Sequence, residues 1–241
     1  MSIQFSQAKY GICQRARKRA GVDATQWPTE NIANSCNDWL DFIVQVGIGL
    51  DKEFQFDDIN HTALPEGTTP LVSGQSDYSF LTDEQNNSII TLTGISLIDS
   101  NGKETPLELV DRNDISYDIS TFGKNSGLPT KYDKISDNIV RLETKPTAQN
   151  VTDYDLKYYF QRIGSYFTDA DTTKTPGVSP LLHKGFWVHS AYEIADTLGL
   201  TNLQSISRER DIEIQKLKDY FSIRNQDKPK KRMTMKKILY I

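Results

Sequence analysis

The sequence lacks the features that mark membrane proteins and the common classes of enzyme. No apolar run approaches the roughly 18 residues that a membrane helix needs, and the N-terminus lacks the apolar core of a signal peptide. There is no CxxC, HExxH or GxSxG motif, no EF-hand loop, and no glycine-rich loop between a strand and a helix. We therefore expect a protein that stays in the cytosol, with no enzymatic activity, cofactor or bound metal.

Cysteine and histidine, the residues of many metal and redox sites, are scarce. The two cysteines, Cys13 and Cys36, are expected to be buried thiols rather than a disulfide. His183 and His189 are six residues apart, so on one helix they point to different faces and do not share a metal. His189 and Glu193 have the spacing of a proton-transfer pair, but a surface hydrogen bond is the interpretation that we favour.

Positive charge is concentrated at the two ends of the chain. The net charge is −4, yet residues 1–20 carry +5 and residues 224–241 carry +6, which leaves −15 on the residues between them. Basic ends on an acidic body indicate contact with nucleic acid or with a neighbouring copy of the protein. The alternative is a solvated helix face and a frayed tail. The N-terminal cations that we expect to face an acidic surface or DNA are Arg15, Arg17, Lys18 and Arg19.

Apolar residues recur every three to four positions in four segments, which predicts amphipathic helices over 5–20, 28–47, 179–199 and 201–225. Pro28 and Pro180 occupy first-turn positions, where a missing N–H costs nothing, and Ser179 is a suitable N-cap. We expect the two N-terminal and the two C-terminal helices to pack together as one bundle.

Between these helix pairs the apolar period changes to two. The alternation slips phase at Gly94, within residues 90–97, as it does at a β-bulge. Residues 99–102, Asp-Ser-Asn-Gly, predict a type I′ hairpin turn, and residues 136–138 predict a second hairpin. Tyr154, Leu156, Tyr158 and Phe160 alternate along a last strand. The pattern predicts five or six short antiparallel strands.

Together these segments predict an α+β fold: a four-helix bundle with an inserted antiparallel β-sandwich or barrel-like region and an extended C-terminal tail. The expected parts are N-terminal helices with a crossing loop over 1–75, an inserted β domain over 76–163, a connector over 164–178, C-terminal helices over 179–225, and a basic extended arm over 226–241.

One order of short motifs carries more information than composition does. A turn with Gly127, Pro129 and Tyr132 precedes the strand 139–142; Pro146, the tyrosine-rich strand 155–159 and a helix that opens at Ser179-Pro180 follow. This order resembles that of the head–tail connector proteins of tailed bacteriophages, also called adaptor or neck proteins. In the turn, glycine permits an unusual φ, proline stiffens the chain and tyrosine anchors it on the sheet.

The resemblance implies a structural protein of the virion, made in the host cytoplasm and located at the neck between head and tail. Such subunits form a ring of about twelve copies under the portal protein and extend the channel for packaged double-stranded DNA toward the tail. The C-terminal arm would then dock on the portal or on a tail-completion protein by strand addition or groove binding. The residues expected to dock are Lys228, Lys230, Lys231, Arg232, Lys236, Lys237, Ile238, Leu239, Tyr240 and Ile241.

Two other classes of function remain open at this point. A nucleic-acid-binding protein would use the basic ends, although the acidic middle of the chain would repel phosphates. A carbohydrate-binding tail module would use the β region, although the helices and the lack of repeats argue against it. A small hydrolase ranks last because no nucleophile has a recognisable base.

Overall fold

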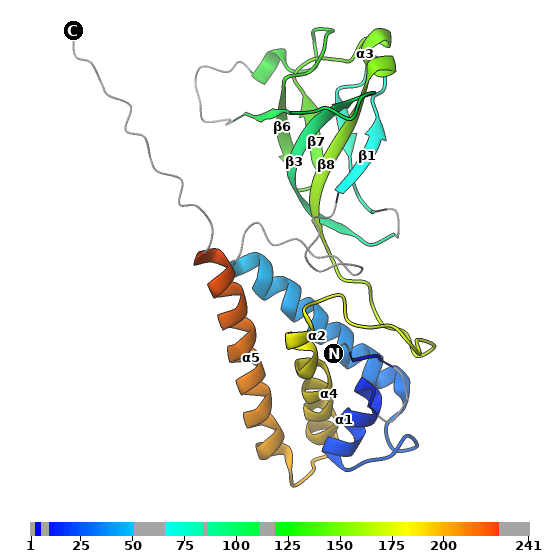
Figure 1. Cartoon of the computed structure of the whole chain (residues 1–241), viewed down its shortest axis with the longest axis vertical. Helices are drawn as coiled ribbons and strands as arrows, with labels where there is room; N and C mark the ends of the chain where they lie inside the picture. Colours follow the sequence, from blue (N-terminus) through cyan, green and yellow to red (C-terminus); the bar gives the residue numbers. More distant parts are fainter. Residues whose placement is uncertain (1–2, 6–9, 51–65, 84–85, 111–118, 227–241) are drawn as a thin grey trace, which may run out of the picture.

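The computed structural model describes residues 3–5, 10–50, 66–83, 86–110 and 119–226. A helical part and a β part are stacked along the long axis of the molecule (Figure 1). The helical part contains α1 (Ile12–Ala20), α2 (Thr29–Leu50), α4 (His183–Thr197) and α5 (Leu203–Gln226). The β part contains β1 (Glu66–Pro70), β2 (Asp77–Ser79), β3 (Ile89–Asp99), β4 (Glu104–Pro106), β5 (Glu108–Leu109), β6 (Lys131–Ser136), β7 (Ile139–Leu142), α3 (Ala148–Asp153) and β8 (Tyr154–Arg162). Of the helices in these ranges, none combines the length and the apolar character needed to span a bilayer.

The main apolar core of the helical part joins α2, α4 and α5, and two smaller buried clusters lie along α4. The α2 residues that face it recur at helical spacing and are buried: Ile32, Cys36, Trp39, Leu40 and Ile43. They pack against Phe186 of α4 and against Leu217 and Phe221 of α5. Helix α4 contacts each of the other three helices of the helical part, α1, α2 and α5. Removing these faces from water is the main force that joins segments far apart in the sequence.

The β part consists of two four-stranded sheets, in the orders β1-β8-β3-β4 and β2-β7-β6-β5. Their inner faces share one core, to which the first sheet contributes Leu97, Leu156 and Phe160 and the second contributes Val140 and Leu142. The alternation predicted along the last strand is therefore confirmed at Leu156 and Phe160.

The bulge and the hairpin turns are partly as predicted. The register of β3 against β8 shifts between Leu92 and Gly94, which confirms the bulge. The turn between β3 and β4 is closed by a hydrogen bond of 2.9 Å from the Gly102 N–H to the Asp99 carbonyl. Only Gly102 in this turn has a positive φ, of 80°, so the turn is not type I′. It is a type I turn followed by a left-handed glycine, the usual form of a three-residue hairpin loop.

The predicted four-helix bundle with an inserted antiparallel β-sandwich or barrel-like region is wrong. The described residues form an α+β fold with five α-helices and two four-stranded sheets. The extra helix, α3, is only six residues long, too short for an apolar period, and depends on a capping box between Thr147 and Asn150. The second sheet is mixed, because β5 and β6 pair in parallel across the long connection 110–130.

Other element boundaries also differ from the prediction. Strand β1 lies inside the predicted crossing loop and pairs with β8, while α2 continues to Leu50 and residues 51–65 lie outside the described ranges. Helix α1 begins at Ile12 after an extended Gly11, with φ −70° and ψ 166°, so the first helix is shorter than 5–20. Ser179 makes no capping hydrogen bond through its side chain, and the chain enters α4 through a 3-10 turn at Pro180–Leu182. The predicted extended tail lies beyond the described residues.

The connector 164–178 is fixed against the helical part. The Phe167 N–H donates to Asn37 Oδ1 over 2.8 Å, and Asn37 Nδ2 donates to the Phe167 carbonyl over 3.0 Å. The Phe167 ring also stacks on Phe5, with 4.9 Å between the ring centroids. This pair of hydrogen bonds holds the chain that leaves β8 against α2.

Candidate interaction surface

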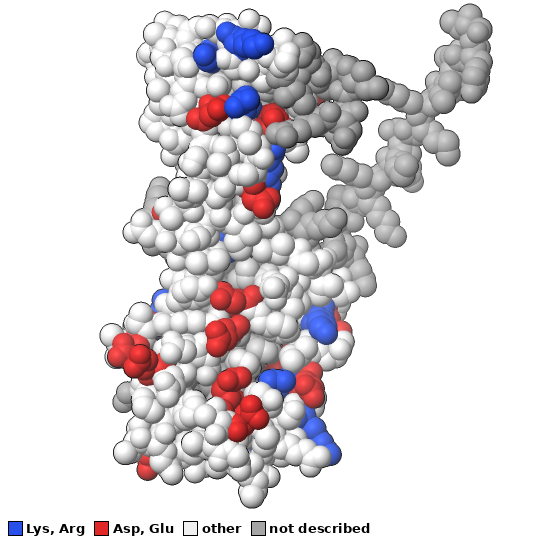
Figure 2. Space-filling model, turned by 180° about the vertical axis from the view of Figure 1, so that it is seen from behind, with Lys and Arg blue, Asp and Glu red and all other residues white. Residues whose placement is uncertain are grey.

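Acidic side chains gather in a column over the helical part of the molecule (Figure 2). Four carboxylates of α2 and α4, which we call the acidic surface, are those of Asp38, Asp41, Glu193 and Asp196. Asp38, Asp41 and Asp196 are exposed and Glu193 is half-buried. Within the described residues none of the four forms an ion pair with lysine or arginine.

The electrostatics show that these carboxylates act on one another. Burial and the nearby Asp38 and Asp196 raise the pKa of Glu193, against the opposing effect of Arg210 in α5. Burial, together with the carboxylates of Asp41 and Asp38, raises the pKa of Tyr166 to about 12. The Tyr166 hydroxyl donates to Asp41 over 2.8 Å. Like charges held close together repel, so a cationic partner would relieve an existing cost.

The sequence analysis missed the acidic surface, because α2 and α4 are far apart in the chain. A signal was present in each helix: Asp38 and Asp41 are three residues apart, as are Glu193 and Asp196. Such pairs share a helix face. What the sequence could not supply is the packing of α2 against α4, which brings the two pairs together.

Of the predicted cations of α1, Arg17 is used inside the protein. Its side chain is buried, and Nε donates to the Trp27 carbonyl over 3.0 Å. Its Nη2 donates to Thr29 Oγ1 over 3.0 Å. The guanidinium therefore ties α1 to the loop that leads into α2.

The other three cations are more accessible. Arg19 forms an ion pair of 2.9 Å with Glu209 of α5. Arg15 Nε donates to the carbonyl of Tyr10 over 2.9 Å. Lys18 is exposed. Since Arg17 and Arg19 already bind groups of the same chain, α1 offers fewer charges to a partner than its sequence indicates.

The turn that carries the family resemblance is positioned by the second sheet. Tyr132 is buried in the β core, as its predicted anchoring role requires, and Pro129 is buried. Gly127 does not have a positive φ; the left-handed glycine of this region is Gly123, with φ 69°. The Gly127 carbonyl accepts a hydrogen bond of 3.1 Å from Thr144 Oγ1.

The two histidines that the structure describes pack within the helical part and contact groups of their own chain. The Ile3 N–H donates to His183 Nδ1 over 3.1 Å, so Nε2 carries the proton and donates to the Val178 carbonyl over 2.9 Å. His189 lies 3.9 Å from Glu193, too far for the predicted surface hydrogen bond, and its ring stacks on Trp39. The described part of the chain contains no group of three or more His, Cys, Asp or Glu that would hold a metal.

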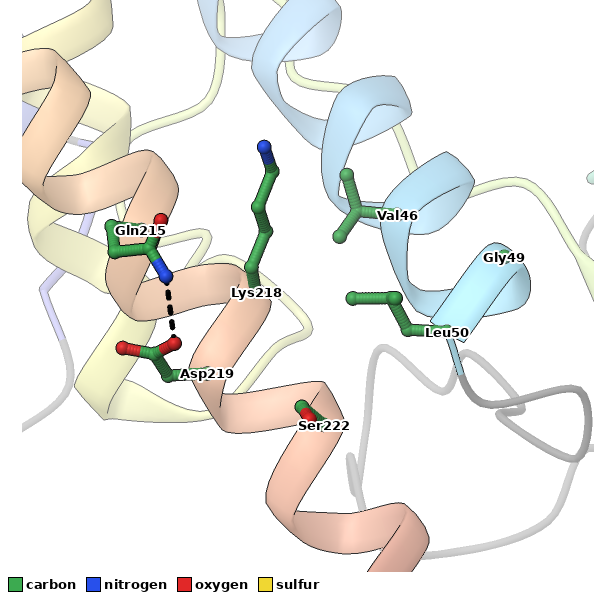
Figure 3. Close-up of a pocket in the computed structure, with 7 residues that line it drawn as sticks. All are labelled: Val46, Gly49, Leu50, Gln215, Lys218, Asp219 and Ser222. Atoms are coloured by element: carbon green, nitrogen blue, oxygen red, sulfur yellow. Dashed lines mark hydrogen bonds between the residues drawn. The ribbon is translucent and has the colours of Figure 1, made fainter.

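A groove runs between the C-terminal halves of α2 and α5 (Figure 3). One wall is formed by Val46, Gly49 and Leu50 of α2, and the other by a single face of α5. The α5 wall, at helical spacing, consists of Gln215, Lys218, Asp219 and Ser222. The volume of the whole groove is about 560 Å³. An apolar wall that faces a polar wall is suited to an amphipathic chain segment.

The predicted docking residues of the C-terminal arm, Lys228 to Ile241, lie outside the described residues. Comparison with models of known protein families gives no match for this chain, and a search of curated proteins gives none either. The candidate site therefore rests on the geometry of the acidic surface and the groove.

Proposed function

We propose that the chain is a structural subunit of a phage neck, a head–tail connector that works in a ring between portal and tail. The observation that carries this proposal is the acidic surface: four neighbouring carboxylates, none of which forms an ion pair with lysine or arginine among the described residues, on a chain with a basic segment at 228–237. A surface of one sign and a segment of the other sign on the same chain are complementary, which favours a specific head-to-tail contact between identical subunits.

The proposed function does not require a catalytic site. A ring subunit acts through the surfaces that it offers to its neighbours, and an acidic surface on the helical part would repel the phosphates of DNA. Helix α1 also argues against DNA binding as the main function, since two of its cations, Arg17 and Arg19, already bind groups of their own chain.

The test is complementation of a phage that lacks this protein, with joined particles counted by electron microscopy. The double variant Asp38→Lys/Asp41→Lys is expected to leave heads and tails unjoined, because it reverses the charge of the α2 half of the acidic surface. The control, Asp155→Lys/Asp211→Lys, makes the same change of charge at exposed carboxylates of β8 and α5. Equal joining by both variants, or joining and DNA retention without the protein, would contradict the proposal.

A further inference from the structure

The groove between α2 and α5 presents apolar surface that the described residues leave uncovered. Leu50 is 39% exposed and Val46 is half-buried, and both line the groove. A Cβ added at Gly49 would meet no atom within 4 Å, so the wall is open there. A volume of about 560 Å³ lies in the range of sites that hold a ligand or a few side chains.

We propose that this groove binds residues 238–241 of the same chain, Ile-Leu-Tyr-Ile. Helix α5, which forms one wall of the groove, ends at Gln226, one turn beyond Ser222. The segment that follows therefore begins beside the groove. Its only run of consecutive apolar residues is 238–241.

The length of the intervening chain allows the return. The α5 wall extends from Gln215 to Ser222, about 10 Å along the helix axis. The 11 residues from 227 to 237 span up to about 35 Å when extended, so residue 238 reaches any point of the groove. A connection of this length gives an effective local concentration of about the millimolar range, which favours the same chain over a second copy.

Charge complementarity supports the same occupant. On α2, steps of three or four residues lead from Asp38 through Asp41 and Gln45 to Gly49, so the acidic surface continues into the groove along one stripe of the helix. Lys236 and Lys237 directly precede the apolar run. With residues 238–241 in the groove, these two lysines approach Asp41, which forms no ion pair among the described residues.

The inference concerns the free chain and does not depend on a role in the phage neck. It is tested by hydrogen–deuterium exchange with mass spectrometry on the full-length protein, read out on fragments that cover 233–241. Exchange there is expected to be at least about tenfold slower than in a synthetic peptide of residues 227–241. It should not change over a roughly hundredfold range of protein concentration.

Two variants identify the groove and its occupant. Leu50→Glu, which places a charge in the groove, should return the exchange of the segment to the rate of the free peptide. Leu198→Glu is the matched control, because Leu198 is 43% exposed at the other end of the helical part, and it should leave exchange slow. Ile238→Glu/Tyr240→Glu should release the segment without touching the folded part.

Three results would overturn the inference. Exchange in the wild-type chain at the rate of the peptide would show an empty groove. Slow exchange that survives Leu50→Glu would place the segment elsewhere. Protection that grows with protein concentration would mean that the occupant comes from a second copy.

Discussion

The indole of Trp39 in α2 lies directly against the backbone of Gly185 in α4. A Cβ built at Gly185 would be 2.6 Å from both Nε1 and Cζ2 of that ring, closer than carbon atoms approach in folded proteins. Trp39 is buried and also stacks on His189 with 5.1 Å between ring centroids. The close approach of α2 and α4, on which the acidic surface depends, therefore requires glycine at position 185.

Gly185→Ala is expected to destabilise the protein by about 1–3 kcal/mol, because the added methyl group must displace a packed ring. The measurement is urea unfolding followed by tryptophan fluorescence. Gly49→Ala is the matched control, also a glycine in a helix but with open space around the new methyl group. It should be neutral or stabilising by up to about 1 kcal/mol. If both variants unfold at the same urea concentration, the packing of α2 on α4 described here is wrong.

Stability should fall on mild acidification through His189. Burial, with a smaller effect of Arg210, lowers the pKa of His189 from 6.5 to about 4. The unfolded chain therefore binds the proton first, and the free energy of unfolding decreases as the pH falls from about 6.5 toward 4, by about 3 kcal/mol at most. Above pH 6.5 His189 is neutral in both the folded and the unfolded chain, so its contribution to the free energy of unfolding no longer changes with pH.

The control for this pH dependence is His189→Gln, which cannot take up the proton. Denaturant unfolding from pH 7 to pH 4.5 should show a shallower loss of stability in the variant than in the wild-type protein. Two curves of equal slope would mean that His189 keeps an ordinary pKa.

Arg17 and Lys18 are neighbours of equal charge with opposite expected effects. Arg17→Met leaves the Trp27 carbonyl without its donor in a buried site and should cost about 1–3 kcal/mol. Lys18→Met, at an exposed position, should change stability by less than about 0.5 kcal/mol. The measurement is thermal unfolding of the two variants in parallel. A Lys18→Met variant less stable than Arg17→Met would contradict the structural role given to Arg17.

Two arginine–aspartate pairs of the β part differ in burial and should differ in strength. Arg162 and Asp83 form a pair of 3.2 Å with side chains 5% and 9% exposed. Arg141 and Asp77 form a pair of 2.8 Å at the surface, with 39% and 49% exposed. Asp83→Ala removes the carboxylate beside a buried guanidinium, together with the oxygens that accept hydrogen bonds from Asn87, and should cost about 3–5 kcal/mol.

The exposed pair is the control. Asp77→Ala should cost at most about 1 kcal/mol, because water and salt screen the charges. Differential scanning calorimetry at low and high salt would show the contrast, and comparable losses for the two variants would contradict the burial of the Arg162 pair.

Local signals in the sequence predicted some of the local structure, although the turn type at 99–102 and the side-chain cap at Ser179 were wrong. The phase slip at Gly94 and the glycine at position 102 mark features that depend on a few adjacent residues, and both are present in the structure. Features that depend on distant partners were missed. Strand β1 is recognisable only through its pairing with β8, and the two-residue β5 only through its parallel contact with β6. The same limit hid the acidic surface, because no pattern within α2 indicates that α4 carries the matching carboxylates.

The most direct test of the proposed connector function is native mass spectrometry of the full-length chain mixed with a candidate portal protein encoded near it. A connector predicts a discrete complex with about twelve copies of the chain on the portal ring, lost when residues 226–241 are deleted. A chain that remains monomeric beside the portal, and shifts in mass only when an oligonucleotide is added, would contradict the connector function and favour nucleic-acid binding.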